Sequence, residues 1–136
     1  MSFREKSAWI TFLTVLLTAG AFFNAMLFMD LSPHERLTTM IACAVGLVAL
    51  QVVLHVAAAI MNPADARSPK DEREKAIERR AYGVGYWVLV AGVAAMFVTG
   101  HMTFSASAVL YNALAALTAA ALAIALTQIV LFRLGR

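Results

Sequence analysis

Three histidines and a few buried amides are the residues of this apolar chain whose side chains could bind a ligand or move a proton. Gln51 and His55 are four residues apart, which places them on one face of a helix. One interpretation is that His55 is neutral and joins two helices by a hydrogen bond to Gln51, Gln128 or a backbone carbonyl. The other is that His55 is a ligand or proton site, because ionisable groups inside a membrane generally serve a function.

His34 and His101 lie near the ends of two predicted helices. If those helices run antiparallel, the two imidazoles face each other at the outer membrane surface. Asp30 and Glu35 lie close to the first of them in the chain. Imidazole and carboxylate suit a first-row metal, and two imidazoles suit a haem. Because the spacing matches no known ligand motif, we expect no cofactor, with a haem- or metal-binding redox protein as the alternative.

Catalytic motifs are not evident in the sequence. It contains no nucleophile beside a base, no phosphate-binding glycine loop and no dinucleotide motif, so an enzyme is the class with least support. Cys43 is a single thiol within an apolar run, and we interpret it as a small buried residue. No Asp, Glu, Lys or Arg lies inside a predicted hydrophobic core, which disfavours a proton-coupled exporter. A small transporter or channel subunit, lined by Gln51, His55 and Gln128, remains an alternative.

The composition indicates an integral membrane protein, since 62% of the 136 residues are hydrophobic and only 14% are charged. We expect an all-α fold in which four transmembrane helices form an antiparallel bundle. The whole chain, residues 1–136, is expected to be one domain. The expected helices span about 8–29, 33–61, 69–100 and 108–131, with residues 69–80 forming a cytoplasmic extension of the third.

Helix-capping residues set two of these boundaries. Ser32 precedes a proline, and Glu35 stands three residues later, which predicts a capping box at the start of the second helix. Asn62-Pro63 is expected to end that helix, because proline disfavours helix in the residue before it. We expect a polar loop over Asn62–Arg67 and a new helix that begins at Ser68-Pro69.

The basic residues predict how the chain crosses the membrane. Ten of the 11 Lys and Arg residues lie in the amino-terminal leader, in residues 67–80 or in the carboxyl-terminal tail, and Arg36 is the exception. The positive-inside rule therefore places both termini and the central segment in the cytoplasm of a bacterial inner membrane. We assign the small positive excess to this topology and expect the lipid bilayer, not nucleic acid, as a partner. Small residues such as Ala42 and Gly46 favour close packing within the bundle or in a homo-oligomer.

The central segment, Ser68–Ala81, is nearly balanced in charge. One interpretation is a solvated helical extension that only supplies charges for topology. The other is a docking site for a cytoplasmic regulatory protein. In that case Ile77 would be the apolar anchor, with Arg73 and Arg80 on the same side of the helix at i−4 and i+3.

This segment resembles a family of small uncharacterised bacterial four-helix inner-membrane proteins. The similar residues are Asp71-Glu72-Arg73, then Ile77, then Arg80-Ala81, which gives the pattern D-E-R-x-x-x-I-x-x-R-A before the third helix. The leader from Ser2 to Trp9 and the stretches Gln51–His55 and Gln128–Arg133 are also similar to proteobacterial members. Some similar proteins are encoded beside a helix-turn-helix regulator. The resemblance therefore implies a sensor or sequestering partner for such a regulator.

Overall fold

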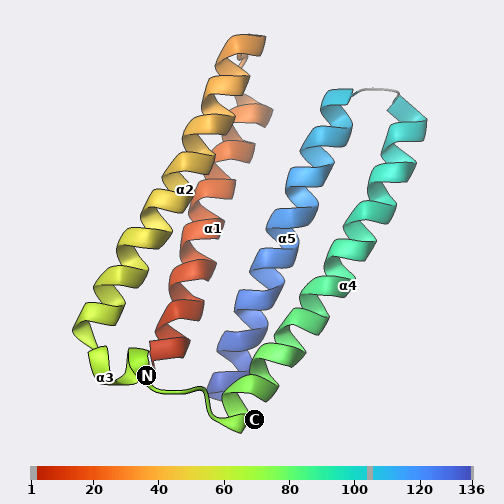
Figure 1. The fold of residues 1–136 in the computed structure, drawn as a ribbon. Coiled ribbons are helices and arrows are strands. Elements are labelled where there is room, and N and C mark those ends of the chain that lie inside the picture. The colour runs from red at the N-terminus through yellow and green to blue at the C-terminus, as the bar shows by residue number, and fades with distance from the viewer. Residues whose placement is uncertain (1–2, 104–105, 136) are drawn as a thin grey trace. The chain divides into compact units, whose positions relative to one another are not determined.

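The chain is helical throughout the part that the structure describes. The computed structural model describes residues 3–103 and 106–135, and every regular element in these ranges is a helix (Figure 1). Each of the four long helices has the length and hydropathy needed to cross a membrane, which takes about 20 residues. The prediction of an all-helical protein with four such helices is confirmed. The helices are α1 (Phe3–Phe28), α2 (Pro33–Met61), the short α3 (Pro63–Arg67), α4 (Glu72–Thr103) and α5 (Ala106–Arg133).

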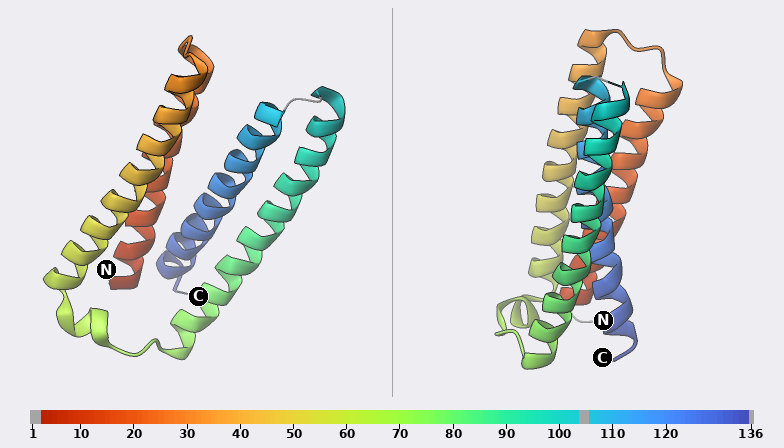
Figure 2. Two further views of the ribbon diagram at one scale, coloured as in Figure 1. Left: turned by 45° about the horizontal axis from the view of Figure 1, so that its top comes forward. Right: turned by 90° about the vertical axis from the view of Figure 1, so that its right-hand side faces the viewer.

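The helices divide into two compact units, Met1–Ser68 and Pro69–Arg136. In the first unit α1 and α2 lie side by side in opposite directions, and α3 follows at the end where α1 begins (Figures 1 and 2). In the second unit α4 and α5 form another antiparallel hairpin. In each unit, residues near the start of the first long helix therefore lie close to residues near the end of the second.

The boundaries of α2 follow from its capping residues, as predicted. The backbone N–H of Glu35 donates to Ser32 Oγ at 3.4 Å, and the Ser32 N–H donates to Glu35 Oε2 at 2.8 Å. These two bonds satisfy donors that would otherwise lack partners at the helix start. The helix ends at Met61, directly before Asn62-Pro63. The predicted range of 33–61 and the predicted capping box are both confirmed.

The amino-terminal leader is part of α1, which begins at Phe3 and not at the predicted residue 8. The reason is a contact with α3: the Phe3 N–H donates to a carboxylate oxygen of Asp65. Arg4 also donates to the carbonyl oxygen of Ser68 at 2.9 Å. The leader is thus held by residues more than 60 positions away, and local sequence did not reveal this.

The connection between the units differs from the expected loop and helix start. Residues Pro63–Arg67 form α3, and Ser68 ends that helix instead of beginning the next one. The N-terminal cap of α4 is Asp71, whose Oδ1 accepts from the Glu74 N–H at 2.6 Å. In return, the Asp71 N–H donates to Glu74 Oε2 at 3.3 Å. Asp71 is a stronger candidate cap than Ser68 because this pair makes both bonds of a capping box.

Small residues hold α4 and α5 close together. A Cβ atom added to Gly92 would lie 2.4 Å from the Cβ of Ala116, and one added to Gly85 would lie 2.3 Å from Cγ1 of Ile124. Such distances are far below van der Waals contact, so a Cβ at either position would force its neighbour to move. At Gly92 that neighbour is Ala116, whose Cβ cannot rotate away, and at Gly85 it is the side chain of Ile124. Close approach of this kind is how helices associate in lipid, where apolar burial from water does not drive packing. Helix α4 ends at Thr103, three residues after the predicted end at 100, and α5 begins at Ala106, two residues before the predicted start at 108. Residues 104 and 105 of the predicted connector lie outside the described residues.

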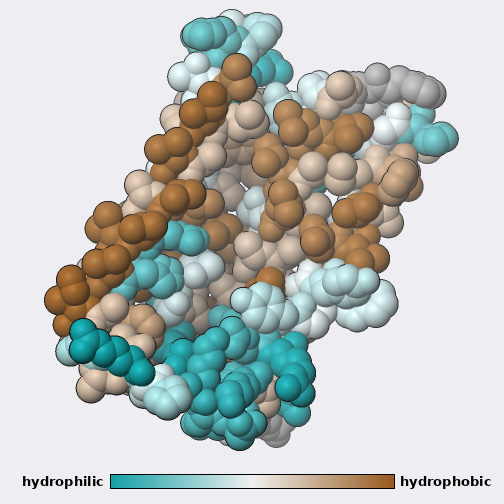
Figure 3. Space-filling model, viewed as in Figure 1, coloured by the Kyte–Doolittle hydropathy of each residue, from teal (hydrophilic) through white to brown (hydrophobic). Residues whose placement is uncertain are grey.

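The outward side of α2 is apolar. Val45 is 63% exposed, Val53 62% and Ile60 73%. Figure 3 shows a row of hydrophobic residues along α2. Exposed apolar side chains over the length of a helix are expected where the surrounding solvent is lipid.

Candidate functional site

A polar seam between α1 and α2 contains the first group of predicted site residues. His55 Nδ1 lies 2.8 Å from the carbonyl oxygen of Gln51, and His55 Nε2 lies 2.9 Å from Ser7 Oγ. A carbonyl oxygen can only accept, so Nδ1 must carry the hydrogen. In the neutral imidazole Nε2 then accepts a hydrogen bond from the Ser7 hydroxyl. Both ring nitrogens are satisfied, and one of these bonds joins the two helices.

Gln51 extends the seam along the hairpin. Its Nε2 donates to Thr14 Oγ1 at 3.3 Å, and the Thr14 hydroxyl donates to the carbonyl oxygen of Ile10 at 2.8 Å. Thr14 is 2% exposed, so its hydroxyl needs these partners. The prediction that Gln51 and His55 share one helix face is confirmed, because both reach α1. His55 bonds to the backbone carbonyl of Gln51, so the Gln51 side chain is left to bind Thr14 on α1.

Ser7 and Thr14 are not among the predicted site residues, although their spacing contained a signal. They are seven residues apart on α1 and therefore lie on one face, as do Gln51 and His55 on α2. Antiparallel pairing of two such polar faces predicts these contacts. Gln128, the third predicted intramembrane polar residue, is half-buried on α5 in the second unit. A path lined by Gln51, His55 and Gln128 together therefore stays a prediction.

The Ser7–His55 contact has the distance of a nucleophile and its base, and the Gln51 carbonyl orients the ring as a third group would. The pair can hold or pass one proton between a hydroxyl and an imidazole. Catalysis of acyl transfer would also need donors aimed at a developing oxyanion. The contact directly explains how the two helices are joined, and we interpret it as a structural link.

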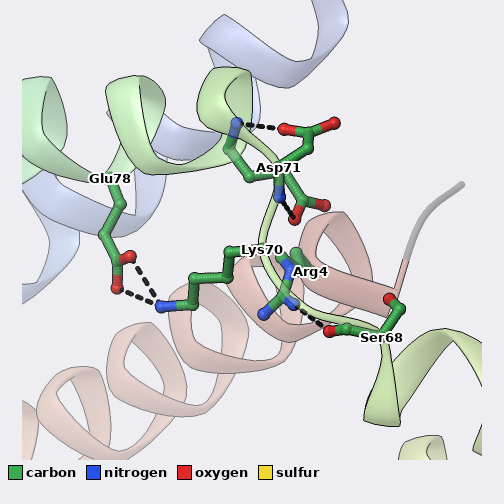
Figure 4. A network of polar contacts seen from close by, with 6 residues as sticks. Arg4, Ser68, Lys70, Asp71 and Glu78 are labelled. Carbon is green, nitrogen blue, oxygen red and sulfur yellow. Dashed lines mark hydrogen bonds and ion pairs between the residues drawn. The ribbon is translucent and has the colours of Figure 1, made fainter.

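The charged segment at the start of α4 satisfies its acidic residues internally. Lys70 Nζ lies 2.6 Å and 2.8 Å from the two carboxylate oxygens of Glu78, and Lys75 Nζ lies 2.7 Å from Glu72 Oε1. Figure 4 shows the Lys70–Glu78 pair and the capping bonds of Asp71 at close range. The fourth carboxylate, that of Glu74, belongs to the same capping box. All four acidic side chains of this segment therefore have partners within it.

The arginines of the same segment remain exposed. Arg73, Arg79 and Arg80 are exposed on α4, and no carboxylate of the described residues lies within ion-pair distance of their guanidinium groups. Although the formal charge of the segment is nearly balanced, its acidic side chains are paired with lysines or bound in the α4 cap, and its arginines are exposed. The outward surface of this part of α4 is consequently cationic.

Ile77 does not have the position that a docking anchor requires. Its side chain is only 1% exposed, so it offers no surface to a partner, and this part of the prediction is corrected. The physical reason is helical spacing: Ile77, Ala81 and Gly85 follow at intervals of four residues, and all three are buried. The apolar residue between the charges extends the packed row of α4 into its charged first turns.

The two histidines considered as metal ligands are exposed at helix ends. His34 is in the first turn of α2, and His101 is in the last turn of α4. The first belongs to one unit and the second to the other, so their pairing stays a prediction. Among residues 3–103 and 106–135 there is no group of three His, Cys, Asp or Glu side chains that could hold a metal ion.

An open groove of about 470 Å³ lies between α1 and α2, nearer to their connecting turn. Its lining is mostly apolar and small. Cys43, the single thiol, is half-buried there. The lining residues are Leu17, Thr18, Ala21, Thr38, Thr39, Ala42, Cys43 and Gly46.

Comparison of the chain with models of protein families, with curated proteins and with solved structures finds no match.

Proposed function

We propose that this chain is a non-enzymatic, multi-pass protein of a bacterial inner membrane, which acts as a sensor, regulatory or accessory subunit by engaging a cytoplasmic partner protein. Four helices of suitable length and hydropathy support the membrane assignment. The concentration of ten of the 11 Lys and Arg residues in the two termini and in residues 67–80 supports a cytoplasmic location for these parts. An antiparallel bundle of all four helices belongs to the same proposal.

One observation carries the partner assignment: Arg73 and Arg80 are exposed while the acidic side chains around them are engaged with Lys70, Lys75 and the α4 cap. The two arginines are seven positions apart, so they lie on one side of the helix, about two turns from each other. Guanidinium groups that are not already paired favour bidentate contacts with carboxylates. The partner surface is therefore expected to be acidic, and it does not involve Ile77.

The polar seam supports a structural role for the residues that a transporter would use. The imidazole of His55 and the amide of Gln51 are both engaged in hydrogen bonds between α1 and α2. Hydrogen bonds of this type join membrane helices. Haem or metal binding through His34 and His101, and transport through an oligomer, remain alternatives to the proposal.

Co-purification in mild detergent tests the partner assignment. A photo-reactive residue placed at the exposed Ala76 should cross-link one defined protein to the native chain. The double variant Arg73→Glu/Arg80→Glu should lose this product, and each single variant should weaken it, whereas Arg67→Glu, which has the same charge change on α3 as either single variant, should keep it. A product that survives in the double variant, or the lack of any product in the native chain, would refute the assignment.

The topology has its own test in a Cys43→Ser background. A cysteine at His34 should react with a membrane-impermeant maleimide in intact spheroplasts, because the turn before α2 is expected outside the cytoplasm. A cysteine at Ala76 should react only after lysis. The reverse pattern would overturn the orientation without bearing on the partner.

A further inference from the structure

The cationic and aromatic residues of α4 meet around a glycine that has no packing role. A Cβ atom added to Gly83 would have no atom within 4 Å, whereas one added to Gly85 or Gly92 would lie within 2.4 Å of a side-chain atom of α5. Gly83 costs about 1 kcal/mol of helix propensity relative to alanine, as glycine generally does inside a helix. Packing between α4 and α5 therefore does not explain why residue 83 is a glycine.

Four exposed side chains surround this glycine. Arg79 and Arg80 precede Gly83 by one helical turn, and Tyr86 and Trp87 follow it by one turn. The two rings are in edge-to-face contact, with centroids 5.4 Å apart, and they are 60% and 67% exposed. Helical side chains lean toward the amino terminus, which directs both rings toward the turn that contains Gly83. No ring atom lies within 4 Å of the position of a Gly83 Cβ, so the space above the glycine is open. We name this group, Arg79, Arg80, Gly83, Tyr86 and Trp87, the Gly83 notch.

We propose that the Gly83 notch binds the headgroup of an anionic phospholipid. Arg79 and Arg80 have no acidic partner among the described residues, and two adjacent guanidinium groups suit the oxygens of a phosphate. The two rings provide the amphipathic surface that is enriched at the level of glycerol and carbonyl groups. The missing side chain at Gly83 leaves space between these two levels.

The dimensions favour a lipid over a free phosphate ion. The arginines and the rings are seven residues apart, or about 10 Å along the helix. The polar layer on each side of a bilayer is about 5–8 Å thick, and arginine side chains extend outward into it. One end of the notch is therefore charged and the other apolar, and only an amphipathic ligand complements both ends.

The test uses the full chain reconstituted in phosphatidylcholine vesicles with increasing phosphatidylglycerol. A Trp9→Phe background leaves Trp87 as the single tryptophan, since the chain has two. Quenching of Trp87 by brominated phosphatidylglycerol, compared with brominated phosphatidylcholine, measures which lipid occupies the notch. We expect a preference for the anionic lipid of about five-fold for each arginine, the size of effect that one basic residue has near an anionic surface.

Matched variants make the result specific. Arg79→Gln/Arg80→Gln should reduce the preference to about one, and Gly83→Leu should reduce it by filling the notch, whereas Arg73→Gln should leave it unchanged. Equal quenching by both lipids in the native chain, or a preference that persists in the double variant, would overturn the proposal. Abolition of the preference by millimolar inorganic phosphate would also overturn it, in favour of a free anion. Arg79→Gln alone changes the Gly83 notch but leaves Arg73 and Arg80, the residues of the partner proposal, intact. A failure of the lipid proposal can therefore be distinguished from a failure of the partner proposal.

Discussion

The Nε2 atom of His55 lies 2.9 Å from the hydroxyl oxygen of Ser7, and this contact joins the last third of α2 to the second turn of α1. The residues are 48 positions apart in the chain. The Gln51 side chain binds Thr14 in the same seam, so two polar contacts hold one hairpin. In lipid, where apolar surfaces gain little by association, such contacts contribute to helix pairing.

A double-mutant cycle should measure this contact. Ser7→Ala and His55→Ala together should lose less stability than the sum of the single losses, with a coupling of about 0.6 kcal/mol and at most about 1.7 kcal/mol. The measurement is unfolding of the detergent-solubilised chain by SDS, followed by circular dichroism. Thr18→Ala combined with His55→Ala is the control, because Thr18 bonds only within α1 among the described contacts. Strict additivity for Ser7 and His55 would show that the contact contributes nothing.

Glycines of α4 should differ sharply in their tolerance of alanine. Gly92→Ala places a methyl group where Ala116 already lies, 2.4 Å away, and should destabilise the α4–α5 hairpin by about 1–3 kcal/mol. Gly83→Ala meets nothing within 4 Å and should be neutral or slightly stabilising, because alanine is the better helix former. SDS unfolding compares the two variants. Equal effects of both would contradict the close approach of the helices at Gly92.

The cap of α4 can be located by hydrogen exchange. Asp71→Ala should increase amide exchange in residues 72–75, at a cost of about 1 kcal/mol, because it removes the acceptor of the Glu74 N–H. Ser68→Ala should leave these amides unchanged, since Ser68 Oγ donates to the Asp65 carbonyl at the end of α3. Exchange followed by mass spectrometry resolves the two segments. A larger effect of Ser68→Ala on α4 would restore the start at Ser68-Pro69 predicted from the sequence.

Ile77 should behave as a packing residue. Ile77→Ala should destabilise the chain by about 2–5 kcal/mol, the usual range for removing a buried isoleucine side chain, because Ile77 is 1% exposed. Val84→Ala is the matched control on the same helix, at 43% exposure, and should cost much less. The readout is again SDS unfolding. If Ile77→Ala left stability intact but abolished partner cross-linking, the original assignment of Ile77 as an anchor would be correct.

The amino-acid sequence determined the class of this protein and part of its local structure. Four apolar runs of sufficient length predict four membrane-crossing helices, because a helix is the simplest way to satisfy backbone hydrogen bonds in lipid. Ser32, Pro33 and Glu35 predict the start of α2, because capping depends on neighbours three residues away. The face shared by Gln51 and His55 also follows from helical spacing alone.

Only the tertiary structure decided what these residues contact. Ser7 and Thr14 became partners of α2 through the pairing of α1 with α2, and Phe3 entered α1 through Asp65. Ile77 changed from an expected anchor to a buried residue, because a single apolar side chain among charges cannot be assigned as exposed or buried without knowing what packs beside it. Contacts between residues distant in sequence depend on which helix faces meet, and periodicity within one helix does not contain that information.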